Sequence, residues 1–108
     1  MESSQVIQAL GALAHPLRLQ VFRALVQAGA SGLTPGALTG PLSVPAATLS
    51  FHLRELHLAG LIDQERQGRH LIYRADMACM NQLLGYLTAN CCEGQPCEMS
   101  PAAETCDC

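Results

Sequence analysis

The sequence predicts a mainly α-helical domain of about five helices with a small β-hairpin over residues 1–90, followed by an acidic tail over residues 91–108. Three observations lead to this prediction. Apolar residues recur at helical spacing behind repeated helix-start signals. The stretch of residues 61–74 instead has the pattern of two strands around a glycine turn. Five of the six cysteines lie in the last eighteen residues.

Size and composition limit the classes of protein. A chain of 108 residues is long enough for one domain with a modest core. Hydrophobic residues make up 49% of it, with two Phe, two Tyr and no Trp, so Leu, Val, Ile and Ala must build that core. No apolar stretch reaches the roughly twenty residues of a bilayer span, and the first residues carry no basic signal region. We therefore expect a cytoplasmic protein that does not contact a membrane.

Charge and thiols are distributed unevenly along the chain. Residues 1–90 hold six Arg against five acidic residues, a net charge of +1, whereas residues 91–108 hold four acidic residues and no Lys or Arg. The cytosol keeps thiols reduced, and clustered cysteines suit a soft ion or a redox reaction better than a disulfide framework. The tail is therefore the candidate for thiol chemistry.

Two helices are predicted at the start of the chain. Ser3 or Ser4 can cap a first helix that runs to about Leu13. A second helix starts at Pro16, because proline is favourable at a first helical position, and ends at Gly29.

Two further helices follow in close succession. Thr34-Pro35 repeats the cap-then-proline signal and opens a short third helix, which Gly40-Pro41 closes. Ser43 is expected to cap a fourth helix over residues 45–59. Gly60 is well placed as its C-terminal stop.

The remaining elements are a hairpin and a last helix. Residues 61–66 and 69–74 are predicted to be two strands, with Gln67 and Gly68 in the turn between them. Asp76 can then cap a final helix that reaches about Asn90. Met77, Met80, Leu84 and Leu87 mark its apolar stripe, which we interpret as core or dimer seam.

The third and fourth helices suggest DNA binding. Two helices joined by a short turn, the second with an apolar inner stripe and small polar residues outside, are typical of a helix-turn-helix. The hairpin after them would be a wing, so the predicted fold is a winged helix-turn-helix. Thr48 and Ser50 could reach base edges or phosphates, and Arg54 a phosphate. An ordinary surface helix would also turn polar residues outward, so periodicity alone does not decide between the two.

Three motifs resemble the ArsR/SmtB family of winged-helix, metal-responsive repressors. They are Ala-His-Pro-Leu-Arg-Leu at residues 14–19, Ser-Phe-His-Leu-Arg-Glu-Leu at the start of residues 50–62, and residues 66–74. The resemblance implies a homodimer joined through its first and last helices that binds an inverted-repeat operator in double-stranded DNA and is released by an inducer. The candidate DNA-binding residues are Ala47, Thr48, Ser50, Phe51, His52, Arg54, Arg66 and Arg69.

The chain departs from the better-known members at their inducer sites. Many arsenic- and cadmium-sensing members carry cysteines at the start of the third helix, where this chain has Thr34 and Gly36. Neither residue can bind a soft ion. Zinc-sensing members place Asp, His and Glu ligands along the last helix, but residues 76–90 contain one acid and no His. The resemblance therefore leaves the sensing chemistry to the tail.

The tail offers three thiols close in sequence. Cys91 and Cys92 are adjacent, and Cys97 follows a Gly- and Pro-containing segment that favours a turn. Three thiolates without an imidazole suit arsenic(III), or antimony(III), better than zinc, which prefers four N or S ligands. Some ArsR repressors have a similar cysteine arrangement near the C-terminus, with a gap one residue longer. Cys106 and Cys108 are weaker candidates as ligands than these three, and Cys79 is expected to be a small core residue.

Other functions remain open at the level of sequence. The thiols could form a redox switch in the same repressor, for example through a Cys92–Cys97 disulfide, or the chain could sequester a soft metal without binding DNA. An enzyme such as a thiol-based arsenate reductase is not expected, because no Arg or Lys follows Arg74 to hold an anion. The four histidines have no metal-ligand spacing and are assigned to packing, capping or phosphate contact.

Overall fold

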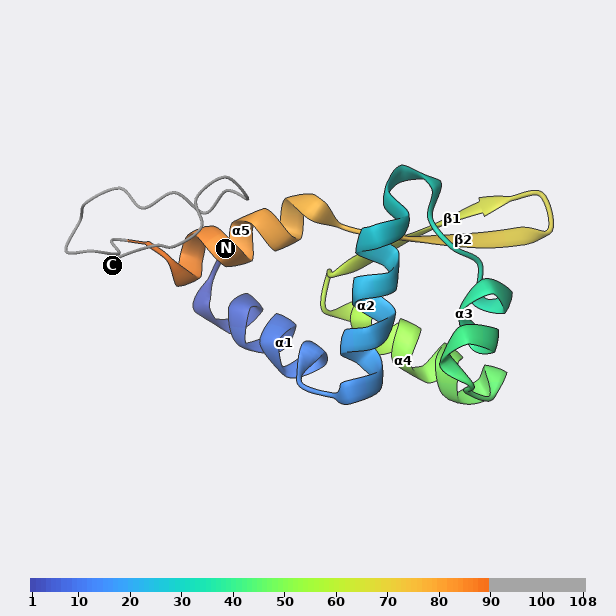
Figure 1. The fold of residues 1–108 in the computed structure, drawn as a ribbon. Coiled ribbons are helices and arrows are strands. Elements are labelled where there is room, and N and C mark those ends of the chain that lie inside the picture. The colour runs from blue at the N-terminus through green and yellow to red at the C-terminus, as the bar shows by residue number, and fades with distance from the viewer. Residues whose placement is uncertain (90–108) are drawn as a thin grey trace.

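The computed structural model describes residues 1–89 and contains the predicted helices and hairpin in the predicted order. Figure 1 shows α1 and α5 at one end of the molecule, and α3 and the hairpin at the other. The fold class is therefore confirmed. The elements are α1 (Ser3–Leu13), α2 (Pro16–Ala28), a 3-10 turn η1 (Gly29–Ser31), α3 (Pro35–Leu42), α4 (Ala46–Leu58), β1 (Ile62–Gln67), β2 (His70–Ala75) and α5 (Met77–Leu87).

The first two helices begin with caps that the sequence prediction did not assign. Glu2, not Ser3 or Ser4, is the N-cap of α1, and it forms a reciprocal capping box with Gln5. At α2 the ring Nδ1 of His15 accepts a hydrogen bond from the backbone N–H of Leu17 at 3.1 Å. Both caps satisfy amide groups that have no partner within the helix.

The turn between α3 and α4 differs from the predicted one. α3 continues through Gly40 and Pro41 to Leu42, because a proline in the last turn removes only one hydrogen bond of a helix that is ending anyway. Ser43 has a left-handed backbone, with φ of 53°, and is the C-cap of α3. It is therefore not the N-cap of α4, a position that Pro45 occupies without a side-chain hydrogen bond.

The hairpin is shifted by one residue from its predicted boundaries. β1 pairs with β2 in antiparallel register from Ile62 opposite Ala75 to Gln67 opposite His70. The two-residue turn is thus Gly68-Arg69, with Gly68 at φ of 62°. A positive φ at the first turn position is the pattern of a type II′ turn, which requires glycine there.

A short third strand pairing joins the hairpin to the helices. Leu33, in the linker after η1, exchanges two backbone hydrogen bonds of 2.9 Å with Tyr73 of β2. Gly32 makes this close approach possible. A Cβ on Gly32 would lie 2.6 Å from the Tyr73 carbonyl oxygen, and its φ is 67°. Only glycine fits this position without strain.

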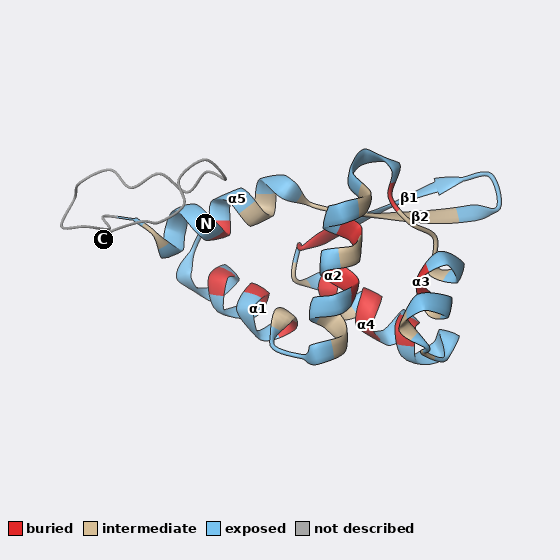
Figure 2. Cartoon of the chain, in the orientation of Figure 1, coloured by how far each residue is buried: buried red, intermediate tan, exposed pale blue. Residues whose placement is uncertain are grey.

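The core lies where α2 and α4 cross. Leu49, Leu53 and Leu56 of α4 are almost completely buried against Val21 and Leu25 of α2. Each buried leucine contributes about 2 to 3 kcal/mol relative to an exposed one. Figure 2 shows the buried residues on the facing sides of α1, α2 and α4, while the outer sides are exposed. Apolar burial on one face of α4 thus determines which residues lie on the other.

The last helix is shorter than predicted. Asp76 caps it, as expected, by accepting a hydrogen bond from the Cys79 N–H at 3.0 Å, but the helix ends at Leu87 instead of near Asn90. Leu83 is its buried residue, whereas Met77, Leu84 and Leu87 are 41 to 52% exposed, so most of the predicted stripe is not core in the single chain. Among the helices of residues 1–89, none is long and apolar enough to span a membrane.

Candidate nucleic-acid interface

The outer face of α4 carries most of the predicted DNA-binding residues. Burial of the leucine stripe turns the opposite face of this helix to solvent. The short α3 and the left-handed Ser43 precede it, which is the arrangement of a helix-turn-helix. The exposed residues of this face are Ala47, Thr48, Ser50, Phe51 and Arg54.

His52 does not lie with them. Its side chain is 7% exposed and faces α2, where its Nδ1 accepts a hydrogen bond of 3.0 Å from Nε of Arg18. The prediction that His52 faces the DNA is therefore wrong for this conformation. Adjacent helical residues point about 100° apart, and the buried side of α4 extends to His52. The ring instead joins α4 to the start of α2.

Arg18 also reaches the outer face of α4. Its guanidinium carbon lies 5.6 Å from the centroid of the Phe51 ring, within the range of a cation–π contact. No local sequence pattern distinguishes Arg18 from the other arginines, because its partners lie more than thirty residues away. The signal that could have identified Arg18 is its place in residues 14–19, one of the three motifs that resemble the ArsR/SmtB family.

The wing carries Arg66 and Arg69 on its surface. Arg66 lies near the end of β1 and Arg69 in the turn, and both are exposed. Within residues 1–89 neither they nor Arg54 forms an ion pair, since the single ion pair of that part of the chain is Arg74 with Glu65. These three guanidinium groups are therefore available to phosphates.

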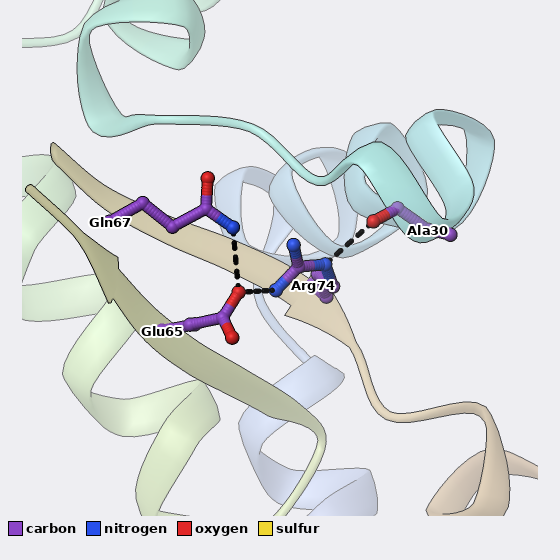
Figure 3. A network of polar contacts seen from close by, with 4 residues as sticks. All are labelled: Ala30, Glu65, Gln67 and Arg74. Atoms are coloured by element: carbon purple, nitrogen blue, oxygen red, sulfur yellow. Dashed lines mark hydrogen bonds and ion pairs between the residues drawn. The ribbon is translucent and has the colours of Figure 1, made fainter.

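Arg74, unlike Arg66 and Arg69, makes contacts within the protein. Its Nε donates to the Ala30 carbonyl of η1 at 2.7 Å, and one terminal nitrogen lies 3.0 Å from the Glu65 carboxylate (Figure 3). Hydrogen bonds from Gln67 and Arg74, together with the Arg74 charge, lower the pKa of Glu65. Sequence reasoning did not identify this network, which fixes the hairpin to the end of α2.

The predicted soft-ion ligands Cys91, Cys92 and Cys97, and the less favoured Cys106 and Cys108, lie outside the described residues. Cys79 is half-buried against the core, and burial raises the pKa of its thiol, as expected for a small core residue. Thr34 caps α3, where its hydroxyl accepts a hydrogen bond from the Ala37 N–H. Residues 1–89 contain no group of three or more Cys, His, Asp or Glu side chains arranged to hold a metal.

Comparison with known proteins agrees with this geometry. Residues 13–65 match a family described as a helix-turn-helix domain. The HTH-type transcriptional regulator YgaV of Escherichia coli K12 is 29% identical over 85 residues, covering 79% of this chain and 84% of YgaV. An ArsR-like transcriptional regulator from Rhodococcus sp. RHA1 has a TM-score of 0.70 and 25% identity, over 78% of this chain and 76% of that one.

A third relative is the homodimeric winged helix-turn-helix DNA-binding domain of Mb0332 from Mycobacterium bovis. It has a TM-score of 0.64 and 26% identity, and the match covers 85% of each chain. The helix-turn-helix, its exposed basic hairpin and these likenesses define a winged helix-turn-helix protein of the DNA-binding class. Within that class, the chain is similar to winged-helix transcriptional regulators of the ArsR type, since the Rhodococcus neighbour is described as ArsR-like and Mb0332 as a possible ArsR-family regulator.

Proposed function

We propose that this regulator is a homodimeric repressor that binds operator DNA through α4 and the wing, and leaves it when arsenic(III) binds the tail. The observation that carries the DNA-binding part is the outer face of α4, where small polar side chains and Arg54 are exposed. A helix of this kind can approach base edges closely, while Arg54 in its C-terminal half and the arginines on the wing contact phosphates.

The dimer is supported by apolar side chains at the opposite end of the molecule. Ile7 and Leu10 of α1 are 67% and 41% exposed, and Leu84 and Leu87 of α5 are 41% and 52% exposed. α1 and α5 also contact each other within the chain, so these side chains belong to neighbouring elements. Pairing with a second copy would bury them, and the Mb0332 domain is described as homodimeric. A two-fold dimer then presents one α4 to each half of an inverted repeat.

The inducer part rests on the chemistry of the tail sequence. Cys91, Cys92 and Cys97 supply three thiols, the number of sulfurs that arsenic(III) binds, in a segment with no Lys or Arg. Arsenous acid is mostly uncharged at neutral pH, so it does not need a cation for binding. Cys91 follows Leu87, the end of α5, by only four positions in the chain. Binding there would act on the helix that we assign to the dimer seam.

Coupling between the two sites follows from that connection. Metal binding that reorders the end of α5 would shift the dimer seam and change the spacing of the two α4 helices. A coupling free energy of about 3 kcal/mol weakens DNA binding more than a hundredfold.

The test is an arsenite titration of the protein bound to a duplex selected from random sequences by the parent protein. DNA release and sulfur-to-arsenic absorbance are followed together. Cys91→Ser, Cys92→Ser and Cys97→Ser should each remain on the DNA at arsenite concentrations that release the parent. The double variant Cys106→Ser/Cys108→Ser is the matched control and should be released as the parent is.

The same assay separates the two alternatives. Release by peroxide without arsenite, reversed by a thiol reductant, would favour a redox switch over an arsenic sensor. A protein that binds arsenite but no duplex at moderate salt would instead be a soft-metal sequestering protein. Single serine variants that respond to arsenite as the parent does would show that the ligand assignment is wrong.

A further inference from the structure

A cluster of four side chains connects the start of α2 to the DNA-facing helix. Nε of Arg18 donates to Nδ1 of His52 at 3.0 Å, and the rings of His15 and His52 lie 4.6 Å apart between centroids. The Phe51 ring meets the His52 ring edge-on at 5.4 Å and also contacts the Arg18 guanidinium. Phe51 is 53% exposed on the outer face of α4. The partly buried Arg18–His52 contact is thus next to the surface proposed to bind DNA.

The hydrogen bonds of the cluster require neutral imidazole rings. Nδ1 of His52 accepts from Arg18, and Nδ1 of His15 accepts from the Leu17 N–H. A neutral imidazole has one accepting nitrogen, whereas an imidazolium has two donors and no acceptor. Protonation of His52 therefore places an N–H opposite the Arg18 N–H and adds a second positive charge beside the guanidinium.

We propose that Arg18 is a positioning residue for DNA recognition, which holds α4 and the Phe51 side chain in their binding arrangement through the neutral ring of His52. This inference rests on the proposed DNA-binding function and adds to it a residue of α2 that is not among the candidate DNA-binding residues. The contact is present while His52 is neutral and opens when the ring gains a proton. DNA binding then weakens in mild acid, although added positive charge would by itself strengthen attraction to phosphates.

The net effect of the surroundings on His52 favours its neutral ring. Burial of the ring lowers its pKa from the ordinary 6.5, and His15 and Arg18 of α2 lower it further, while Glu55 of α4 raises it. α1 and α3, which also pack on α4, contain no ionisable side chain. The ionisable residues of β1, namely Asp63, Glu65 and Arg66, are exposed, as are Arg54 and His57 of α4 itself.

The sign of the pH dependence follows from a lowered histidine pKa. Well above pH 6.5 the ring is neutral whether or not the cluster is formed, so the contact is fully present. As the pH falls below 6.5, the open arrangement binds the proton more strongly than the closed one. The closed arrangement is therefore lost as the pH falls toward the pKa of the ring in the folded protein.

The test measures affinity for the selected duplex from about pH 8 to 5.5, the range in which histidine titrates, and the salt dependence at the upper limit. His52→Asn places an amide oxygen where Nδ1 lies and cannot gain a proton. Arg18→Lys retains the charge but not the planar fork of Arg18, and Arg18→Ala removes both. Arg23→Ala on α2 and His57→Asn on α4 are matched controls, since both side chains are exposed. Circular dichroism at each pH confirms that every variant remains folded.

A positioning role predicts a specific set of results. Relative to His52→Asn, the parent should lose about tenfold in affinity across this range, the effect of one or two hydrogen bonds per dimer. Arg18→Lys and Arg18→Ala should both bind about tenfold more weakly at pH 8, with an unchanged salt slope. The two controls should keep the pH profile of the parent.

Other results would overturn the inference. If Arg18→Lys bound as the parent does and Arg18→Ala lowered the salt slope, Arg18 would be a phosphate contact. An identical pH profile for His52→Asn and the parent would show that His52 has no part in the effect. Nitrogen NMR of the free protein is independent of DNA, and a protonated Nδ1 at neutral pH would disprove the contact itself. A parent that bound no duplex while showing an unprotonated Nδ1 would instead mark failure of the proposed function.

Discussion

The two parts of the proposed DNA interface, α4 and the wing, are held in place by different forces. α4 is fixed by apolar burial, since three of its leucines are at most 1% exposed in the core. The hairpin has only Ile62 fully buried, and depends on the Leu33–Tyr73 backbone bonds and the Arg74 contacts. Burial of an apolar helix face is not screened by salt, whereas the exposed ion pair of Arg74 with Glu65 is weakened by salt and by protonation of the carboxylate.

Because of this difference, α4 and the wing differ in how easily they can move relative to the core. The position of α4 cannot change without disturbing the core, apart from what the Arg18–His52 contact permits. The base of the wing is packed on the core through Ile62, Tyr73 and Ala75, whereas its outer part can be displaced by breaking a few polar contacts. Variants that remove one support at a time should therefore separate loss of the whole fold from loss of the wing.

The largest effect is expected from Leu53→Ala in α4. This side chain is 1% exposed, and its truncation leaves a cavity in the core that α2 and α4 share. The free energy of unfolding should fall by about 3 to 5 kcal/mol. Urea unfolding followed by circular dichroism measures it. Leu58→Ala on the same helix is the control, since Leu58 is 60% exposed and should change stability by less than about 0.5 kcal/mol.

Gly32→Ala should be the next most damaging change, and it acts on the wing side. The new Cβ would meet the Tyr73 backbone at 2.6 Å in a conformation with positive φ, so β2 has to move. We expect a loss of about 2 to 3 kcal/mol and weaker DNA binding. Gly36→Ala has room for its Cβ and should leave the unfolding midpoint nearly unchanged. Equal midpoints for the two alanine variants would contradict the close approach.

Arg74→Gln should separate the wing from the rest of the fold. Loss of the hydrogen bond to Ala30 should lower the free energy of unfolding by about 1 kcal/mol. Loss of the exposed ion pair with Glu65 should add little to this. Operator affinity should decrease through a misplaced wing, with little change in its salt slope. Arg66→Gln is the comparison: its stability should remain that of the parent, while its salt slope falls by about one unit for each phosphate that is no longer neutralised. If Arg74→Gln lowered the salt slope and Arg66→Gln did not, Arg74 would be the phosphate contact and Arg66 would not.

The smallest effect concerns the acid range. The pKa of Glu65 is lowered by Gln67 and Arg74, so its contribution to stability is present above the ordinary value of 4.5 and is lost as pH falls through the folded pKa. The midpoint of thermal unfolding of the parent should therefore approach that of Glu65→Gln as the pH is lowered below 4.5. Asp63→Asn, an exposed change on the same strand, should not reproduce this convergence.

Local patterns in the sequence predicted the order of elements and the exposed residues on the outer face of α4. Cap signals at Thr34 and Asp76 were correct because a side chain that bonds an amide three residues away depends only on nearby residues. The errors at Ser43 and in the hairpin turn also have a local cause. Turn residues such as Ser, Pro and Gly fit several positions of a turn, and packing on both sides selects one of them.

The sequence by itself determined the fold class, the family resemblance, the outer face of α4 and the cluster of thiols in the tail. The resemblance rests on three short motifs and the others on periodicity and spacing, and all of these are properties of residues near one another in the chain. Only the tertiary structure decided that His52 turns inward to Arg18 and that Arg74 binds η1 instead of being free for DNA. Their partners lie 34 and 44 residues away, and contacts at that separation depend on how helices cross, which no local pattern specifies.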